Sequence, residues 1–307
     1  MAEVTVFTAA RSQQIEDTAV VGGRIEGSNG HLMLIKNNGS ETDAGAISFF
    51  AATDTAAGSV ELATIAETQA GTDTVRAVTP AGLASLAGYR HFGYVIFTSS
   101  GTFSKDTYPG LKAVKVRVVG AGGGGGGAPF ANTGNHSAGG GGGGGGYCEK
   151  FIAASALFAS ETVTVGAGGG GGSTLGGTGG SSSFGAHAVA SGGAGGDSFA
   201  NNALMLGALG GAGGIGSVNN GSAIMAAGDA GGTGSGNATL GHGAKGGASV
   251  LGGGGAAVYT GSGSASTPGN PGKNYGGGGG GAQCNSTGAG SNGGAGAPGI
   301  VIVEMYI

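Results

Sequence analysis

Aromatic, amide and histidine side chains interrupt the glycine-rich second half of this 307-residue sequence, and they are the residues best suited to chemistry. The candidate binding residues in these interruptions are Phe130, Asn132, Asn135, His136, Phe199, Asn201, Tyr259, Asn270 and Tyr275. Aromatic rings stack on sugars or lipids, and amides hydrogen-bond hydroxyl groups. Loops of this composition on a stiff scaffold are typical of recognition surfaces. The alternative is that the four aromatic rings only plug the ends of the scaffold.

The sequence lacks the residue spacing that catalysis or metal binding requires. The sequence holds five histidines, scattered without metal-ligand spacing. The acidic residues of the glycine-rich half are isolated, whereas a glycosidase needs two carboxylates flanking one bond. The glycine turn after Val119 looks like a dinucleotide fingerprint, but no amphipathic helix follows it. We therefore expect no catalytic residues, no metal, no cofactor and no enzymatic activity.

Charge and hydropathy narrow the range of partners further. The formal net charge is −4, and the sequence contains no basic stripe, so nucleic-acid binding is not expected. No apolar run approaches the ~18 residues of a membrane span, and no signal peptide is visible, so membrane insertion is not expected. Cys148 and Cys284 each follow a glycine run. We expect free thiols, with a disulfide between the two as the alternative.

Glycine dominates the sequence, with 80 residues in all, and most of them follow Val119. Many recur at every third position, as at Gly207, Gly210, Gly213 and Gly216. Three residues per turn is the period of the polyproline II helix, which has no internal hydrogen bonds. Such a helix presents bare glycine edges whose N–H and C=O groups can reach a neighbouring helix. The uninterrupted runs at 139–146 and 276–281 suit the middle of a stack.

A flexible low-complexity tail is the competing interpretation of this composition. Glycine in a regular element costs about 0.5–1 kcal/mol per residue relative to alanine. A linker, however, has no need of a period of three, and a buried backbone must pair its polar groups. The sequence therefore predicts packed polyglycine helices.

The remaining segments predict short strands and helices. Strands are expected at 4–7, 31–36 and 59–64, with turns at 22–23, 28–30 and 37–39. Thr64 and Glu67 form a capping box for a helix that Gly71 ends, and Thr79-Pro80 begins a second helix that Gly88 ends. Strands at 94–97, 114–118, 162–165 and 300–307 are expected to form one sheet platform for the glycine segments. The predicted fold class is mainly β and irregular, and fibrous.

Several segments resemble bacteriophage tail fibres. Residues 52–64 and 67–83 closely resemble a segment that recurs in the shafts of such fibres. Residues 97–103, 116–123 and 296–303 are similar to the glycine-rich distal domains of these fibres. The polyglycine packing also resembles that of detachable tip adhesins on some long tail fibres.

The resemblance implies a homotrimer that is a component of the virion. Residues 1–50 would attach it to the tail or baseplate, and residues 51–90 would form a shaft. Residues 91–307 would form a tip that meets a bacterial surface receptor, which is a glycan, a lipopolysaccharide or an outer protein. Two alternatives remain at this stage. One is a purely structural virion fibre, and the other is an ice-binding polyglycine bundle, which would leave residues 1–90 without a role.

Overall fold

The computed structural model describes residues 17, 19–26, 31–46, 60–86, 88, 90–202, 207–236, 240–259 and 266–307. The chain divides into two compact units, residues 1–87 and residues 88–307. The described residues form several small antiparallel sheets and two short α-helices, so the predicted, mainly β fold class is confirmed.

A three-stranded antiparallel sheet lies in the first unit, in the order β1 (Val20–Ile25), β2 (His31–Lys36), β3 (Glu41–Ala46). The predicted strand at 31–36 is confirmed, and Gly39 closes its turn with a φ of 79°. The turn predicted at 22–23 is wrong, because both glycines lie within β1. The pairing register shifts between Val20 and Gly22, so the glycines accommodate a bulge there. The expected strand at 4–7 and turn at 28–30 lie outside the described residues.

Two helices follow in residues 60–86. Thr64 and Glu67 form the predicted capping box of α2 (Ile65–Ala70), and Gly71 ends this helix in the left-handed conformation. Helix α3 (Pro80–Leu86) begins where predicted, and its first turn is capped by Thr79, whose hydroxyl accepts from the Gly82 N–H at 3.0 Å. The strand predicted at 59–64 is wrong. Only one β-bridge forms, from Leu62 to Ala77, since the backbone at Thr64 already serves as the helix cap.

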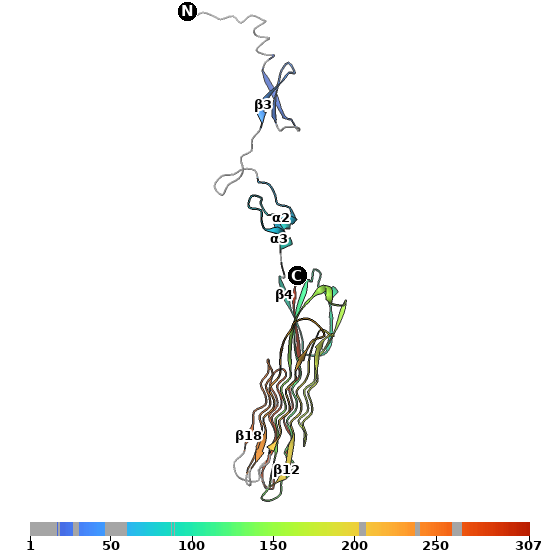
Figure 1. Cartoon of the computed structure of the whole chain (residues 1–307), viewed down its shortest axis with the longest axis vertical. Helices are drawn as coiled ribbons and strands as arrows, with labels where there is room; N and C mark the ends of the chain where they lie inside the picture. Colours follow the sequence, from blue (N-terminus) through green and yellow to red (C-terminus); the bar gives the residue numbers. More distant parts are fainter. Residues whose placement is uncertain are drawn as a thin grey trace, which may run out of the picture. The chain divides into compact units, whose positions relative to one another are not determined.

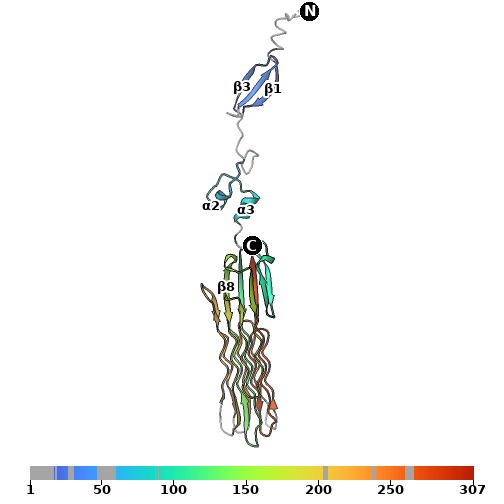
Figure 2. The same ribbon diagram turned by 90° about the vertical axis from the view of Figure 1, so that its right-hand side faces the viewer.

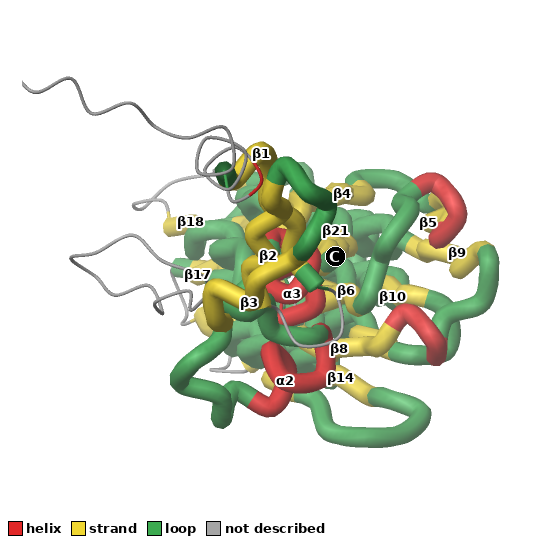
Figure 3. The backbone as a smooth tube through the Cα atoms, turned by 90° about the horizontal axis from the view of Figure 1, so that it is seen from above, coloured by secondary structure: helices red, strands yellow, loops and turns green. Residues whose placement is uncertain are grey.

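The second unit begins with two facing five-stranded sheets, in the orders β15-β8-β6-β21-β4 and β14-β11-β10-β9-β5. Viewed down the long axis, β4, β21, β6 and β8 lie in one row and β5, β9 and β10 in a second row (Figure 3). The strands are β4 (His91–Phe97), β5 (Gly101–Ser104), β6 (Ala113–Val119), β8 (Tyr147–Ala153), β9 (Ser160–Thr164), β10 (Ser182–Phe184), β11 (Ala188–Ala190), β14 (Gly216–Ser217), β15 (Ile224–Ala226) and β21 (Ile300–Tyr306). Two short 3₁₀ helices, η1 (Lys105–Thr107) and η2 (Ala154–Ala156), complete this part.

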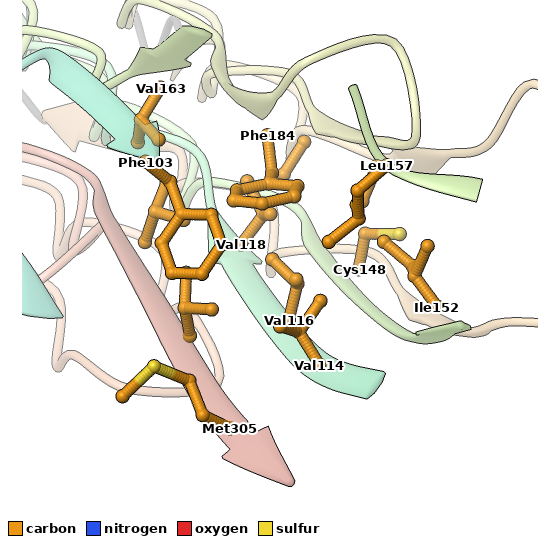
Figure 4. Close-up of a cluster of buried hydrophobic side chains, with 14 residues drawn as sticks. Phe103, Val114, Val116, Val118, Cys148, Ile152, Leu157, Val163, Phe184 and Met305 are labelled. Atoms are coloured by element: carbon orange, nitrogen blue, oxygen red, sulfur yellow. The ribbon is translucent and has the colours of Figure 1, made fainter. Parts of the chain in front are cut away.

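The core of this sandwich lies between the two sheets (Figure 4). Val114, Val116 and Val118 of β6 are fully buried, while the residues between them are partly exposed, so the predicted alternation is confirmed. Phe103 and Phe184 fill the space opposite these valines. The expectation of one sheet platform is wrong. A single sheet would leave its apolar face in water, and the second sheet covers it.

Glycine segments run from the sandwich to the far end of this unit and back (Figures 1 and 2). At the far end, where Figure 1 labels β12 and β18, they lead into two four-stranded sheets in the orders β12-β7-β20-β19 and β13-β16-β17-β18. The strands are β7 (His136–Gly139), β12 (Ser198–Asn202), β13 (Gly207–Ala208), β16 (Gly234–Gly236), β17 (Gly241–Gly243), β18 (Val258–Tyr259), β19 (Ser266–Thr267) and β20 (Gln283–Cys284). We call this the distal end.

Backbone hydrogen bonds join the glycine segments with a period of three. In segment 120–128, every third N–H starting at Gly120 donates to segment 139–146, at N···O distances of 2.8–2.9 Å. The next N–H in each turn donates to segment 174–180, and the third donates to segment 291–297. The carbonyl groups of the same segment accept from three further segments: 169–172, 193–196 and 279–282. Segment 120–128 is therefore surrounded on all sides by other glycine segments.

Segment 139–146 is surrounded in the same way, with three accepting and three donating neighbours, and segment 276–282 is also bonded to neighbouring segments on all sides. The three surrounded segments contain the glycine runs 122–127, 139–146 and 276–281. The prediction that uninterrupted runs occupy the middle of a stack is confirmed. The physical reason is close packing. A Cβ atom built on Gly143 would overlap the carbonyl oxygen of Ala212, and one on Gly125 would overlap that of Gly280.

Segment 208–216, at the edge of this lattice, keeps its large side chains on one row. In segment 208–216, the Gly211 and Gly214 N–H groups donate to the central segment 139–146, each at 2.8 Å. Leu209 and Ile215 are 66% and 62% exposed, so they point away from the lattice. The packed polyglycine arrangement predicted from the period of three is thus confirmed.

Both cysteines are free and buried, as expected. Cys148 belongs to the sandwich core, whereas Cys284 packs in a small cluster with Ala128, Ala131 and Ala282. The alternative of a disulfide between them is wrong. Within the described residues, the helices are too short or too polar to cross a membrane.

Candidate functional site

The distal end is uncharged over most of its surface. The connections between glycine segments at this end contain no Asp, Glu, Lys or Arg, and they span 128–136, 173–175, 198–208, 234–243, 258–267 and 283–291. Their side chains are aromatic, imidazole, amide, hydroxyl, thiol and apolar groups. A surface of this kind recognises partners by stacking and hydrogen bonding, with little contribution from net charge.

Connection 128–136 presents Phe130, whose side chain is 55% exposed. Connection 283–291 holds it in place through the backbone. The Thr287 N–H donates to the Ala131 carbonyl at 2.9 Å, and the Gly134 N–H donates to the Ser286 hydroxyl at 2.9 Å. Gly134 has a φ of 82°, a left-handed conformation that favours glycine. An exposed ring therefore sits on a braced loop.

The two asparagines of this connection belong to its turn. The Asn135 N–H donates to the Asn132 carbonyl at 2.9 Å. Asn132 is exposed and Asn135 is half-buried. Both remain candidates for hydrogen bonding to a partner. Asn201 lies in β12, and its side chain is outside the described part of the structure.

His136 is fully buried between the distal sheets, so it contacts no partner directly. Its ring packs edge-on against that of the half-buried Phe199, with centroids 5.4 Å apart. Neither ring nitrogen has a hydrogen-bond partner. Burial lowers the pKa of His136 below its ordinary value, and the nearby His242 lowers it further. For Phe199, the contacts observed fit the alternative that the aromatic rings plug the ends of the scaffold. His136 was predicted only as a binding residue, and its burial removes it from the surface that a partner could contact.

Tyr259 is the second exposed aromatic residue among the predicted distal positions. It lies in β18, its side chain is 60% exposed, and its ring stacks on that of His242 with centroids 4.9 Å apart. The stack fixes one face of the phenol ring. Phe130 and Tyr259 are thus the two predicted aromatic residues that reach solvent at the distal end.

Asn270 and Tyr275 do not join the distal surface. Asn270 lies along the bundle, where its carbonyl accepts from the Gly280 N–H and its side chain donates to the Ala256 carbonyl at 3.1 Å. Tyr275 packs beside Val119 and Ile300, where the bundle meets the sandwich. The expectation that both belong to binding loops at the distal end is therefore wrong. Their interruptions lie within the lattice and at its opposite end.

Sequence reasoning missed a pocket of about 310 Å³ beside Phe130. Its polar lining includes Ser173 and Thr174, in the turn between two glycine segments, and Ser291 and Asn292. The available signal was the short Ser-Thr-Leu interruption at 173–175, which is the same kind of break as the longer ones. Among the described residues, no cluster of His, Cys, Asp or Glu is arranged to hold a metal ion.

The fold defines a class of protein in which a β-sandwich carries a lattice of polyglycine helices. The sequence model of the glycine-rich domain matches residues 98–306, about two thirds of the chain, and the chain belongs to that family. This match covers the lattice, the distal end and the sandwich except for β4. A comparison with curated proteins finds no match.

Proposed function

We propose that this chain is a bacteriophage tail fibre whose distal end binds a receptor on the surface of the host bacterium. The observation that carries the proposal is the neutral distal surface, with Phe130 and Tyr259 exposed, at the end of a hydrogen-bonded glycine lattice. A rigid scaffold that presents aromatic and amide loops lowers the entropy cost of binding. The resemblance of residues 52–64 and 67–83 to tail-fibre shafts supplies the biological setting.

The proposal includes a homotrimer attached to the tail or baseplate through residues 1–50. Support comes from residues 60–86, where large apolar side chains lie in water: Leu62 is 62% exposed, Val75 85% and Leu83 63%. A segment this small cannot bury them alone, and association with copies of itself would cover them. Three copies of the distal end would then make weak single contacts act together. The role is binding, without catalysis or a cofactor, at the virion surface.

Adsorption competition tests the proposal. The purified full-length chain is incubated with host bacteria before the phage that encodes it is added, and free phage is counted. We expect the chain to reduce adsorption, and the double variant Phe130→Ala, Tyr259→Ala to lose most of this effect. The matched control is Phe158→Ala, since Phe158 is 74% exposed but precedes β9 in the sandwich.

A purely structural fibre is the alternative outcome of this experiment. Such a fibre would neither bind host cells nor compete with the phage at any concentration. That result would refute receptor binding while leaving the fold and the family intact. Equal losses in the double variant and in Phe158→Ala would locate binding away from the distal end, against the proposal.

A further inference from the structure

Backbone hydrogen bonds at the distal end hold the residues that line the pocket beside Phe130. Ala128 and Ser291 exchange two backbone hydrogen bonds, each at 2.8 Å. The Gly127 N–H donates to the Thr174 carbonyl at 2.6 Å, which ties the turn at 173–175 to segment 120–128. These bonds join three connections that are distant in the sequence. The pocket is therefore formed before any ligand arrives, so less ordering accompanies binding.

The lining of this pocket combines one aromatic ring with neutral polar groups. Phe130 supplies the ring, and the polar side chains are those of Ser173, Thr174, Ser291 and Asn292. None of these four side chains hydrogen-bonds another residue within the part of the chain that the structure describes. No Asp, Glu, Lys or Arg lines the pocket. Three hydroxyl groups and one amide are thus available to a ligand.

We propose that this pocket binds a neutral sugar unit of a bacterial surface glycan. A sugar ring has a C–H face that packs on an aromatic ring, and its rim of hydroxyl groups both donates and accepts hydrogen bonds. Serine, threonine and asparagine side chains match that rim, because each can donate and accept. The volume of about 310 Å³ is at the small end of ligand sites and suits one or two sugar rings.

The same lining disfavours anionic and lipid ligands. A phosphate or carboxylate would lose water in a site that offers it no cationic side chain. A lipid chain needs an apolar channel, whereas four of the lining side chains are polar. The inference rests on the proposed function, since it names the class of receptor that the distal end would recognise.

Saturation-transfer NMR on the full-length chain tests the pocket directly. The probes are neutral hexoses, 6-deoxyhexoses, heptoses and N-acetylhexosamines, each offered alone, with a hexose 6-phosphate and N-acetylneuraminate as charged probes. We expect at least one neutral sugar to receive saturation and both charged probes to receive none. Phe130→Ala should weaken binding of that sugar by about tenfold or more, because the stacking surface is lost.

Two further variants distinguish the loss of the Phe130 ring from a loss of folding. Phe130→Tyr retains the aromatic face and should retain binding within about threefold, which shows that the loop itself is intact. Phe158→Ala, with its exposed ring in the sandwich, should bind sugar like the parent chain. Binding of no neutral sugar, preferential binding of the charged probes, or equal binding by Phe130→Ala would each overturn the pocket assignment.

Cell binding by the same variants separates this inference from the proposed function. If Tyr259→Ala abolishes attachment to host cells while Phe130→Ala does not, the fibre binds its receptor away from the pocket, and the assignment of the pocket to the receptor glycan is refuted. If the parent chain binds a neutral sugar but attaches to no host cell, the pocket stands and the proposed tail-fibre function fails. Loss of both sugar binding and cell attachment in Phe130→Ala supports both.

Discussion

At the scale of single residues, the absence of a side chain is the structural requirement of the lattice. Gly143 shows this, because its N–H donates to Ala194 while a Cβ atom at this position would overlap the Ala212 carbonyl. The overlap involves backbone, which cannot rotate out of the way. A methyl group here must push two segments apart.

Gly143→Ala should therefore lower the free energy of unfolding by about 1–3 kcal/mol or more, as overpacking of a close-packed interior does. The matched control is Gly253→Ala, since nothing lies within 4 Å of a Cβ atom built at Gly253. This control should be neutral or stabilise by about 0.4–1 kcal/mol, because alanine restricts the unfolded chain. Denaturant unfolding of the two variants measures the difference, and equal stabilities would argue against close packing around Gly143.

We expect His136 to make the stability of the distal end depend on pH. Burial lowers the pKa of His136 in the folded chain, so the unfolded chain binds a proton that the folded chain does not. The unfolding free energy should then fall as the pH drops below about 6.5, the ordinary histidine value, towards the lower pKa of the folded state. His136→Leu should flatten this dependence between about pH 5 and pH 7.

Thermal unfolding at a series of pH values checks this expectation. The control is Phe199→Leu, which removes the ring packed against His136 but no titratable group. It should lower stability equally at each pH and keep the original slope. A slope that survives in His136→Leu would assign the pH dependence to another group.

At the scale of elements, the period of three was enough to predict the lattice. The place of each interruption between glycine segments, at the distal end or at the sandwich, was not predictable. The period describes the backbone alone, so the glycine rows and the central runs can be read from the sequence. An interruption between glycine segments does not show whether it lies at the distal end, at the sandwich or along the lattice, as Asn270 does. Tyr275 and Phe130 both lie close to glycine runs, yet one packs against the sandwich and the other reaches solvent.

Strand pairing escaped prediction for a related reason. The strands at 162–165 and 300–307 carry the same apolar pattern, but they belong to different sheets because each covers the other's inner face. The pocket beside Phe130 joins three connections, and only the order of the segments in the lattice brings them together. Local signals, such as the capping box at Thr64, were predictable because all their partners lie within a few residues.

The exposed apolar side chains of residues 60–86 are the basis for a prediction about the trimer. Leu83→Asp should shift the chain from trimer to monomer, because burying one leucine contributes about 1.5–3 kcal/mol and the change is repeated in each copy. Leu175→Asp is the matched control, since Leu175 is 66% exposed and Leu83 is 63% exposed. Sedimentation equilibrium measures the mass. A parent chain that is already monomeric would contradict the trimer, and dissociation by Leu175→Asp would place the contact elsewhere.

At the scale of the whole molecule, the large apolar core of the second unit lies in its sandwich, and only small apolar clusters lie elsewhere in its described residues. The lattice beyond the sandwich is held by backbone hydrogen bonds that run between segments distant in the sequence. Each such bond contributes about 0.5–1.5 kcal/mol net, and the ordering of glycine opposes it. The lattice is stable because each central segment is hydrogen-bonded to several neighbouring segments at once, and those neighbours are in turn bonded to others. Its unfolding should be cooperative, and its distal surface should move as one body with it.

Native-state hydrogen exchange of the glycine amides tests this claim most directly. The central segment 139–146 donates all of its N–H groups to other segments. We predict that these amides exchange only through the global opening of the second unit, at one common free energy close to that of unfolding. Exchange at random-coil rates in segment 139–146, with the strands of the sandwich still protected, would contradict the rigid lattice and the presentation of the distal end that depends on it.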